Sequence, residues 1–219
     1  MTDGFVEERG VGGALDEDKD RPFSVLMVCT GNICRSPLAE QLLIAALEPA
    51  GIPLRVTSAG TRALVGQPMT PEAAQLSRVH GGDPDRHVAR QLTRELVEGA
   101  DLILTATRDH RGEVVSLSPV ASRLTFTLRQ FARITAAGVA EVEPPEAGVT
   151  EPGVRPALQA YVAAVAASRG FAPPPERATD DDVEDPYRQS KQVYRRAARA
   201  IDEAVRTIGA GLARAAADR

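Results

Sequence analysis

The sequence predicts an α/β fold in which a four-stranded parallel sheet is covered by helices on both faces. Four short segments are strand candidates, at residues 25–28, 54–58, 102–104 and 124–126. Segments with apolar residues at helical spacing lie between and after them. Because strands that alternate with helices along a chain assemble into parallel sheets, we expect both faces of this sheet to carry helices.

The first strand is followed by a small polar loop and a helix start. Residues 25–28 form a continuous apolar run, which suits a strand buried on both faces. Ser36 and Pro37 then predict the helix N-terminus, with the hydroxyl as cap and the proline in the first turn. A strand, a tight loop and a helix N-terminus together direct backbone N–H groups and the positive helix end at one point. We therefore expect an anion-binding site here.

Six further helices are expected along the chain. Thr70 and Pro71 open the first of these, and the Gly81-Gly82 pair ends it. The last segment has apolar residues at helical spacing and should cover one face of the sheet. The expected ranges are about 70–79, a short helix from 93, 109–117, 128–134, 157–168 and 190–217.

The chain should form one domain with two atypical segments. At 219 residues it is long enough for one substantial core, and two full domains would be crowded. Residues 1–21 are acidic and glycine-rich, without a basic start or an apolar core, so we expect a flexible tail and not a signal peptide. The domain would cover residues 22–217. Proline-rich, acidic stretches at about 140–182 enclose one alanine-rich helix, which we interpret as an insertion on that domain.

Composition and charge disfavour several classes of function. The net charge of −4 gives no support for a nucleic-acid partner, and no apolar run approaches the length of a membrane span. The only two cysteines, Cys29 and Cys34, fall in one loop. A secreted disulfide framework would spread its cysteines, so this pair favours a reducing cytoplasm and reactive chemistry. His80 and His110 share no ligand spacing with each other or with the cysteines, so no metal site is expected.

The Cys29 loop (residues 29–36, Cys-Thr-Gly-Asn-Ile-Cys-Arg-Ser) has the composition of a phosphoryl-transfer site. Five residues separate Cys29 from Arg35, so a loop wrapped around an anion can fold the guanidinium back toward the sulfur. Arginine offers a phosphoryl group paired donors and keeps its charge. The same positive field favours the Cys29 thiolate as a nucleophile, and Ser36 can donate its hydroxyl to that sulfur. Attack on phosphorus would form a phosphocysteine without a metal, nucleotide or other cofactor.

The departing oxygen of such a reaction needs a proton donor, and Asp185 is the candidate. The run Asp185-Pro186-Tyr187 places an acid in a rigid turn before the last helix, beside an aromatic ring. An Asp-Pro pair alone is a common turn element. Together with the Cys29 loop, it favours the general-acid interpretation.

Several stretches of the chain resemble the low-molecular-weight protein tyrosine phosphatase family, over about residues 23–136 and 183–210. The most specific stretch is CTGNICRSP, and the late Asp-Pro-aromatic run strengthens it. Weaker matches are SAGT at 58–61, HVARQL at 87–92 and ADLILTATRDHR at 100–111. The resemblance implies a four-stranded parallel sheet with helices on both sides, and a hydrolase that acts on phosphorylated proteins. We expect a monomer without membrane or nucleic-acid partners.

The resemblance also implies a role for each residue of the site. Cys29 would be the nucleophile, Arg35 the phosphate clamp, and Asp185 the general acid and then the base for water. The phosphate-binding set would be Thr30, Gly31, Asn32, Ile33, Cys34, Arg35 and Ser36, mainly through backbone N–H groups, with Tyr187 as an aromatic wall. The side chains expected to support the loop by hydrogen bonds are Asn32, Ser36, Ser58 and His87.

Two positions depart from the family's pattern and leave the substrate open. Leu64 lies where members acting on phosphotyrosine usually place an aromatic residue, and Arg188 replaces a second aromatic after Tyr187. One alternative is a protein arginine phosphatase, although that branch tends to have threonine at position 33, and Ile33 suits an aryl ester. An arsenate reductase would need further cysteines. A non-catalytic phosphate-binding module would need neither the thiol nor the acid.

Cys34 has two interpretations that stay open at this point. It is either a packed small hydrophobic residue or a reversible disulfide partner that protects Cys29 from over-oxidation. We prefer the disulfide, which would make the site redox-sensitive.

Overall fold

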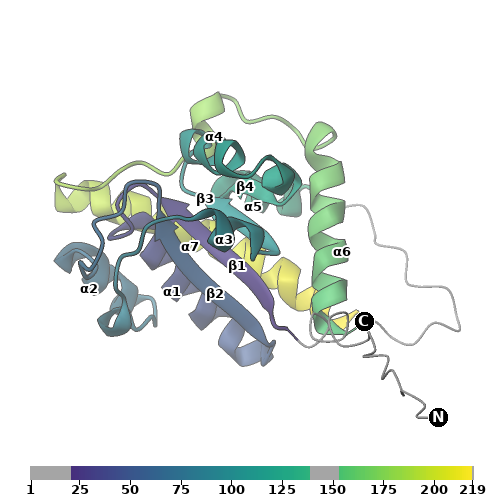
Figure 1. Cartoon of the computed structure of the whole chain (residues 1–219), viewed down its shortest axis with the longest axis horizontal. Coiled ribbons are helices and arrows are strands. Elements are labelled where there is room, and N and C mark those ends of the chain that lie inside the picture. Colours follow the sequence, from purple (N-terminus) through teal and green to yellow (C-terminus); the bar gives the residue numbers. More distant parts are fainter. Residues whose placement is uncertain (1–20, 139–152, 219) are drawn as a thin grey trace, which may run out of the picture.

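The computed structural model describes residues 21–138 and 153–218, and a parallel four-stranded sheet lies at its centre (Figure 1). The strands are β1 (Phe23–Cys29), β2 (Leu54–Gly60), β3 (Leu102–Thr105) and β4 (Thr125–Thr127). Their order across the sheet is β2-β1-β3-β4, and every pairing is parallel. The predicted fold class is confirmed, and each strand begins and ends within two residues of its predicted range.

The register of the sheet brings the functional loops to one edge. β1 pairs with β2 along its whole length, from Phe23 opposite Leu54 to Cys29 opposite Gly60. On its other side β1 pairs with β3. Because the strands are parallel, their carboxyl ends share one edge, which is where ligands bind in sheets of this kind. Cys29, the last residue of the inner strand β1, lies at that edge.

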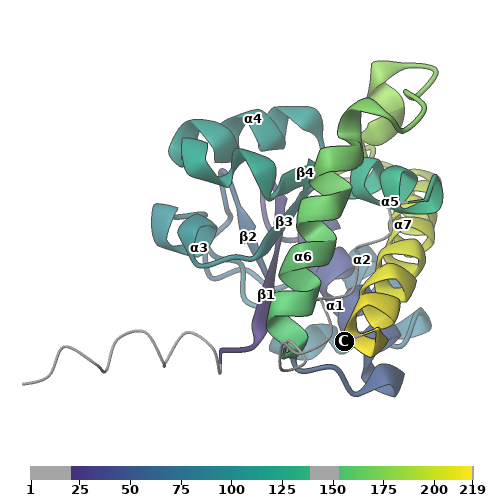
Figure 2. The same cartoon turned by 90° about the vertical axis from the view of Figure 1, so that its right-hand side faces the viewer.

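Seven α-helices surround the sheet within the described residues. They are α1 (Arg35–Leu47), α2 (Pro71–Val79), α3 (Arg94–Glu98), α4 (Arg108–Leu117), α5 (Leu128–Ala136), α6 (Val154–Ala167) and α7 (Lys191–Ala217). Helices α3 and α4 lie on one face of the sheet, and α1, α5 and α7 lie on the other (Figure 2). Among these helices, none combines the length and apolar content needed to cross a bilayer.

Two apolar clusters fill the space between the sheet and its helices. Successive side chains of a strand point to opposite faces. Val25 and Met27 accordingly join the larger cluster, with α1, α5, α6 and α7, whereas Leu26 and Val28 join the smaller one, with α3 and α4. The continuous apolar run of β1 therefore reflects burial on both faces.

The two helices after residue 152, α6 and α7, pack into the larger cluster. Helix α7 has Ser190 as its N-cap residue and buries a stripe that includes Ile201, Val205 and Ile208. Helix α6 buries Leu158 and Val162 in the same cluster, so the helical part of the predicted 140–182 insertion contributes to the main core. Residues 139–152 and the predicted tail, apart from Arg21, lie outside the described residues.

The expected start of α1 was wrong by two residues. The helix begins at Arg35, and Cys34 occupies the N-cap position without a side-chain capping bond. Ser36 lies in the first turn, where its hydroxyl contacts Cys29 and Asn32 instead of a backbone N–H. The Ser36 hydroxyl, which was expected to cap the helix, therefore contacts side chains of the Cys29 loop instead.

Candidate active site

Three segments that are distant in sequence form one pocket of about 140 Å³ at the carboxyl edge of the sheet. They are the Cys29 loop, the loop after β2 and the acid loop, which we define as residues 183–190 before α7. The lining residues are Cys29, Thr30, Gly31, Ile33, Cys34, Arg35, Arg62, Leu64, Asp185 and Tyr187. The structure thus places the predicted nucleophile, clamp and acid around one space.

The Cys29 sulfur is contacted by the Ser36 hydroxyl. The Cys29 Sγ to Ser36 Oγ distance is 3.0 Å. Asn32 Nδ2 donates to Ser36 Oγ at 3.0 Å, so the hydroxyl oxygen accepts from Asn32 and its own hydrogen is left to donate. Its nearest acceptors are the sulfur and, at 3.4 Å, the carbonyl oxygen of Ala59. A donor at the sulfur stabilises a thiolate more than a thiol.

The backbone of the Cys29 loop supplies unengaged donors. Within the described part of the chain, none of the backbone N–H groups of residues 30–34 donates a hydrogen bond. These groups precede the N-terminus of α1, whose partial positive charge adds to theirs. Free N–H groups at a helix N-terminus form an anion-binding site.

Asn32 holds the loop in its unusual conformation. Its φ is 57°, in the left-handed region that costs a residue other than glycine roughly 1–2 kcal/mol. Its side chain donates to Ser58 Oγ at 2.8 Å and accepts from the Arg90 N–H at 2.9 Å. His87 Nε2 donates to the Asn32 carbonyl oxygen at 2.7 Å. The side chains expected to support the loop therefore lie in one network, which also includes Arg90.

Burial shapes the protonation of His87. Desolvation lowers the pKa of His87, although its hydrogen bond to the Asn32 carbonyl opposes that shift. A neutral ring still carries one N–H, which is enough for the contact to Asn32.

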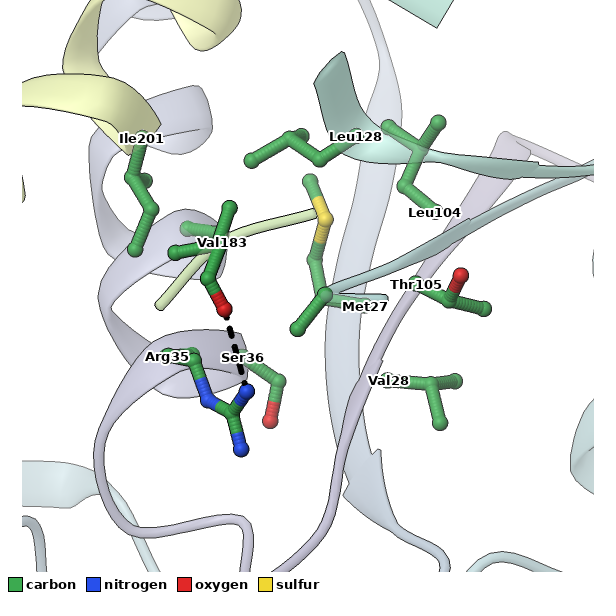
Figure 3. A pocket seen from close by; sticks show the side chains of 11 residues that line it. Met27, Val28, Arg35, Ser36, Leu104, Thr105, Leu128, Val183 and Ile201 are labelled. Carbon is green, nitrogen blue, oxygen red and sulfur yellow. Dashed lines mark hydrogen bonds between the residues drawn. The ribbon is translucent and has the colours of Figure 1, made fainter. Parts of the chain in front are cut away.

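The Arg35 side chain is buried beneath the pocket, with only 5% of its surface exposed. Nη1 donates to the Val183 carbonyl oxygen at 3.2 Å, and Nη2 to Thr30 Oγ1 at 3.4 Å. Figure 3 shows the first of these bonds beside a small space of about 10 Å³ lined largely by apolar side chains, Met27 and Leu128 among them. The guanidinium is thus held at a fixed depth by the acid loop and the core.

Asp185 reaches the pocket from the acid loop. Its Oδ2 lies 3.0 Å from Arg35 Nη2, and about half of its side chain (53%) is exposed. Oδ1 accepts the Tyr187 N–H at 3.2 Å, a local turn that fixes the carboxylate. Arg188 adopts a φ of 60° and places its guanidinium 5.1 Å from the centre of the Tyr187 ring. The Arg188 cation therefore lies over the ring of Tyr187.

The three carboxylates of residues 180–182 each pair with an arginine outside the pocket, whereas Asp185 lines the pocket. Asp180 pairs with Arg177 at 3.0 Å, Asp181 with Arg133 at 2.8 Å and Asp182 with Arg108 at 3.1 Å. Asp182 also accepts the Arg108 N–H at the start of α4, at 2.8 Å. Together with the Val183 N–H bond to the Ala106 carbonyl, these contacts anchor the acid loop to the end of β3.

Cys34 is buried and free, like Cys29. Its sulfur lies 3.4 Å from Thr70 Oγ1 and 3.7 Å from the Tyr194 hydroxyl. Burial raises the pKa of the Cys34 thiol, and burial also raises the pKa of Tyr194 to about 12. Cys34 therefore favours its protonated form more than an exposed thiol does.

Two residues of the site had no assigned role in the sequence-based expectations. Arg62 lines the pocket from the loop after β2 and lies 3.5 Å from Glu113. His110 contacts Thr30 Oγ1 at 2.8 Å. The available signal for His110 was its place in the stretch that directly follows β3. His80, by contrast, pairs with Asp202 on α7 at 3.3 Å.

The described residues offer no metal centre in the geometry shown. Within residues 21–138 and 153–218, no three His, Cys, Asp or Glu side chains come close enough to hold an ion. The site therefore consists of a thiol, an arginine, a carboxylate and a set of free N–H groups. Such an arrangement can bind a tetrahedral dianion, attack it with sulfur and transfer a proton to or from it.

An α/β sheet that presents a cysteine and an arginine on one anion-binding loop defines a class of phosphoryl-transfer proteins. Residues 24–160 match the family model described as "Low molecular weight phosphotyrosine protein phosphatase". The match covers more than half of the chain, and the protein belongs to this family.

Curated relatives and solved structures agree with that assignment. The chain is 38% identical over 108 residues to the low molecular weight protein-tyrosine-phosphatase Etp of Escherichia coli K12, covering 49% of this chain and 70% of Etp. Vibrio vulnificus Wzb in complex with benzylphosphonate superposes with a TM-score of 0.59 at 25% identity, covering 87% of this chain and 99% of Wzb. The YwlE arginine phosphatase from Geobacillus stearothermophilus superposes with a TM-score of 0.58 at 26% identity, covering 86% and 92%.

Proposed function

We propose that this protein hydrolyses phosphotyrosine in proteins through a phosphocysteine formed on Cys29. The observation that carries the proposal is the pocket in which the Cys29 sulfur, the Arg35 guanidinium and the Asp185 carboxylate meet above free backbone N–H groups. We further propose that it works as a monomer in the cytoplasm, where a reducing environment keeps Cys29 and Cys34 as free thiols.

In the first step the phosphoryl dianion binds to the N–H groups of residues 30–34 and to Arg35. The thiolate of Cys29 attacks phosphorus, and the bond between phosphorus and the ester oxygen breaks. The electron pair of that bond goes to the leaving oxygen, which takes a proton from Asp185. A carboxyl group beside a bound dianion keeps its proton more readily, so substrate binding prepares Asp185 as an acid.

In the second step water replaces the thiolate on phosphorus. Asp185, now a carboxylate, takes a proton from the water molecule as its oxygen attacks. The sulfur–phosphorus bond breaks, and its electron pair returns to Cys29. The Ser36 hydroxyl, 3.0 Å from the sulfur, stabilises the thiolate as it leaves. Inorganic phosphate is the product.

The walls of the pocket favour an aromatic ester. Ile33 and Leu64 supply apolar surface, and Tyr187 supplies an aromatic ring that is 38% exposed. A flat ring can pack between these side chains and gain both apolar burial and an aromatic contact. The relatives named as tyrosine phosphatases, Etp among them, support the same substrate class.

A protein arginine phosphatase is the second candidate, because the YwlE arginine phosphatase superposes on this chain as well as Wzb does. The apolar Ile33 at the floor of the pocket and the positive charge of Arg62 at its rim favour the aryl ester. Arsenate reduction would need a further cysteine to carry electrons, and the chain has only Cys29 and Cys34. A binding module would need neither Cys29 nor Asp185.

The experiment is a comparison of phosphate release from four substrates in the presence of EDTA. They are para-nitrophenyl phosphate and peptides that carry phosphotyrosine, phosphoserine or phosphoarginine. The proposal predicts turnover of the two aryl esters, inhibition by vanadate and no turnover by Cys29→Ser. Preferential turnover of phosphoarginine would establish the second candidate. Phosphate binding without turnover of any substrate would identify a binding module.

A further inference from the structure

His110 is a buried titratable residue that the reaction described above does not use. It lies near the start of α4 with 4% of its surface exposed. Its Nδ1 lies 2.7 Å from Thr107 Oγ1, and its Nε2 lies 2.8 Å from Thr30 Oγ1. Thr107 is the N-cap residue of α4, and Thr30 lines the pocket. The contact exists because β1 and β3 are neighbours, so the loops after them meet at the edge of the sheet.

The hydrogen bonds of Thr107 suit the tautomer of His110 in which Nε2 carries the hydrogen. Thr107 Oγ1 accepts the His110 backbone N–H at 3.4 Å as the cap of α4. With one acceptor position filled, Thr107 Oγ1 can donate its own hydrogen to His110 Nδ1, 2.7 Å away. In this tautomer Nε2 carries the hydrogen of the neutral ring and donates it to Thr30 Oγ1. Burial, reinforced by the nearby charge of Arg35, lowers the pKa of His110 to about 4, so the ring is neutral near pH 7.

In this arrangement the Thr30 hydroxyl is left with one free hydrogen. Its Oγ1 accepts from His110 Nε2 and from Arg35 Nη2, the latter at 3.4 Å. A hydroxyl oxygen has two acceptor positions, so both are filled. Among the described residues, no further polar group contacts this hydroxyl. Its hydrogen is therefore available to an oxygen atom bound in the pocket that Thr30 lines.

We propose that His110 is a positioning residue that makes the Thr30 hydroxyl an oriented donor for a phosphoryl oxygen of the substrate. The proposal rests on the proposed phosphatase function. The Thr30 hydroxyl would add one side-chain donor to the backbone N–H groups of the loop. A donor that is already oriented before the substrate arrives costs no reorganisation during the reaction. The hydrogen bond between His110 Nε2 and Thr30 Oγ1 also fixes the position of Thr30 Oγ1, the atom that Arg35 Nη2 contacts.

A double-mutant cycle on inorganic phosphate binding tests the coupling of the two residues. Thr30→Val keeps the branched shape and removes the hydroxyl, and His110→Leu removes the ring nitrogens. Each should weaken phosphate binding about 10-fold, as for a lost hydrogen bond to a charged group. The double variant should bind no more weakly than the weaker single variant, because both remove one and the same donor. Calorimetry measures the binding without turnover, so it is decisive even if the protein hydrolyses none of the substrates above.

Two controls separate positioning from a general structural role. His110→Gln keeps an N–H near the place of Nε2 and should stay within about threefold of the wild type in phosphate binding. His80→Leu removes a histidine that pairs with Asp202 on α7 and should leave binding unchanged. If His110→Leu does not fold, Thr30→Val and His110→Gln still give the comparison. Additive losses in the cycle, or a Thr30→Val variant that binds phosphate as tightly as the wild type, would overturn the proposal.

The tautomer of His110 gives a second test, because a purely structural role for this residue would not require a particular tautomer. Nitrogen-15 NMR of the wild-type protein at neutral pH should show His110 protonated on Nε2 and not on Nδ1. On addition of phosphate, the Nε2 signal should shift while remaining protonated, because Thr30 gains an acceptor. A ring protonated only on Nδ1 would leave Nε2 as an acceptor of the Thr30 hydrogen and would contradict the proposed direction.

Discussion

Arg35 and Asp185 form an ion pair of 3.0 Å at the pocket, so the proposed phosphate clamp and the proposed general acid contact each other directly. Arg35 is almost fully buried, and about half of the Asp185 side chain is exposed. Arg35 Nη1 is fixed by the Val183 carbonyl of the acid loop. A dianion that binds Arg35 through Nη2 must share that nitrogen with Asp185 or displace its carboxylate, so the anion and the acid meet at one guanidinium.

This competition predicts that Asp185→Asn binds phosphate more tightly than the wild type. The substitution removes a negative charge next to the anion and a partner that holds Nη2. Because Asp185 is half-exposed, the gain should be modest, about 2- to 5-fold in affinity. Calorimetric titration with inorganic phosphate measures it, with Asp85→Asn as a matched control that removes an exposed carboxylate paired with Arg78 outside the pocket. Weaker binding in Asp185→Asn would show that the carboxylate organises Arg35 instead of competing for it.

The leaving group separates the acid role of Asp185 from its role in binding. With phosphotyrosine, a poor leaving group, Asp185→Asn should slow the phosphorylation step by on the order of 10²–10⁴. With an activated aryl phosphate the loss should be far smaller, because the leaving anion is already stable. Burst-phase rates for both substrates, in wild type and variant, give the comparison.

Equal losses for the two substrates would mean that Asp185 only shapes the acid loop. The proton donor would then have to come from elsewhere. Asp180, Asp181 and Asp182 are poor replacements, since each is paired with an arginine outside the pocket.

Cys34 should protect the nucleophile from peroxide. Oxidation of the Cys29 thiolate gives a sulfenic acid, which Cys34 can attack to form a disulfide with release of water. Cys34→Ser should therefore convert a loss of activity that dithiothreitol reverses into one that it does not. Serine is a good N-cap residue, so the start of α1 should be preserved.

Mass spectrometry of the peroxide-treated wild type should find a link between Cys29 and Cys34. Because burial raises the pKa of the Cys34 thiol, formation of the link should speed up as the pH rises above neutrality. A Cys34→Ser variant that recovers as fully as the wild type would leave Cys34 as a packed side chain and nothing more.

The buried His110 should make the protein less stable in mild acid. Its pKa is about 4 in the folded protein, against an ordinary value of 6.5. Between pH 4 and pH 6.5 the unfolded chain therefore binds more protons than the folded protein does. The free energy of unfolding should fall by about 3 kcal/mol as the pH drops from 6.5 to 4. His87, whose pKa is also lowered by burial, adds to this fall.

The contribution of His110 is isolated by comparing urea unfolding of the wild type with that of His110→Gln across this pH range. The variant should show a shallower fall, since glutamine does not titrate. Arg35 and Glu113, which act on the His110 pKa in opposite directions, are present in both proteins. Parallel curves would show that His110 takes up no extra proton on unfolding.

The fold was largely predictable from periodicity. The apolar run of β1 and the helical spacing of α7 were visible in the sequence, because burial on two faces or on one stripe leaves a regular pattern. The order β2-β1-β3-β4 was not predicted, because strand pairing depends on contacts between distant segments. The start of α1 was misplaced at Ser36, since a hydroxyl before a proline resembles a cap whether or not it caps.

The site was predictable where one short segment carries the chemistry. Cys29, Arg35 and Ser36 lie within eight residues of one another, so their spacing alone indicated an anion-binding loop. His110 was not recognised, because its contact with Thr30 arises only when β3 pairs beside β1. The ion pair between Arg35 and Asp185 likewise depends on how the acid loop is anchored at Asp182 and Val183.

The central claim is that the reaction passes through a phosphate group on the Cys29 sulfur. Its most direct measurement is acid quenching of the Asp185→Asn variant within milliseconds of mixing with an activated aryl phosphate, followed by peptide mass spectrometry. The variant lacks the base for water, so the intermediate should accumulate. The account predicts one phosphoryl group on the peptide that contains the Cys29 loop, located on Cys29, and none in the double variant with Cys29→Ser. Product release in a burst from wild type without any phosphorylated cysteine, or a phosphoryl group on another residue, would contradict it.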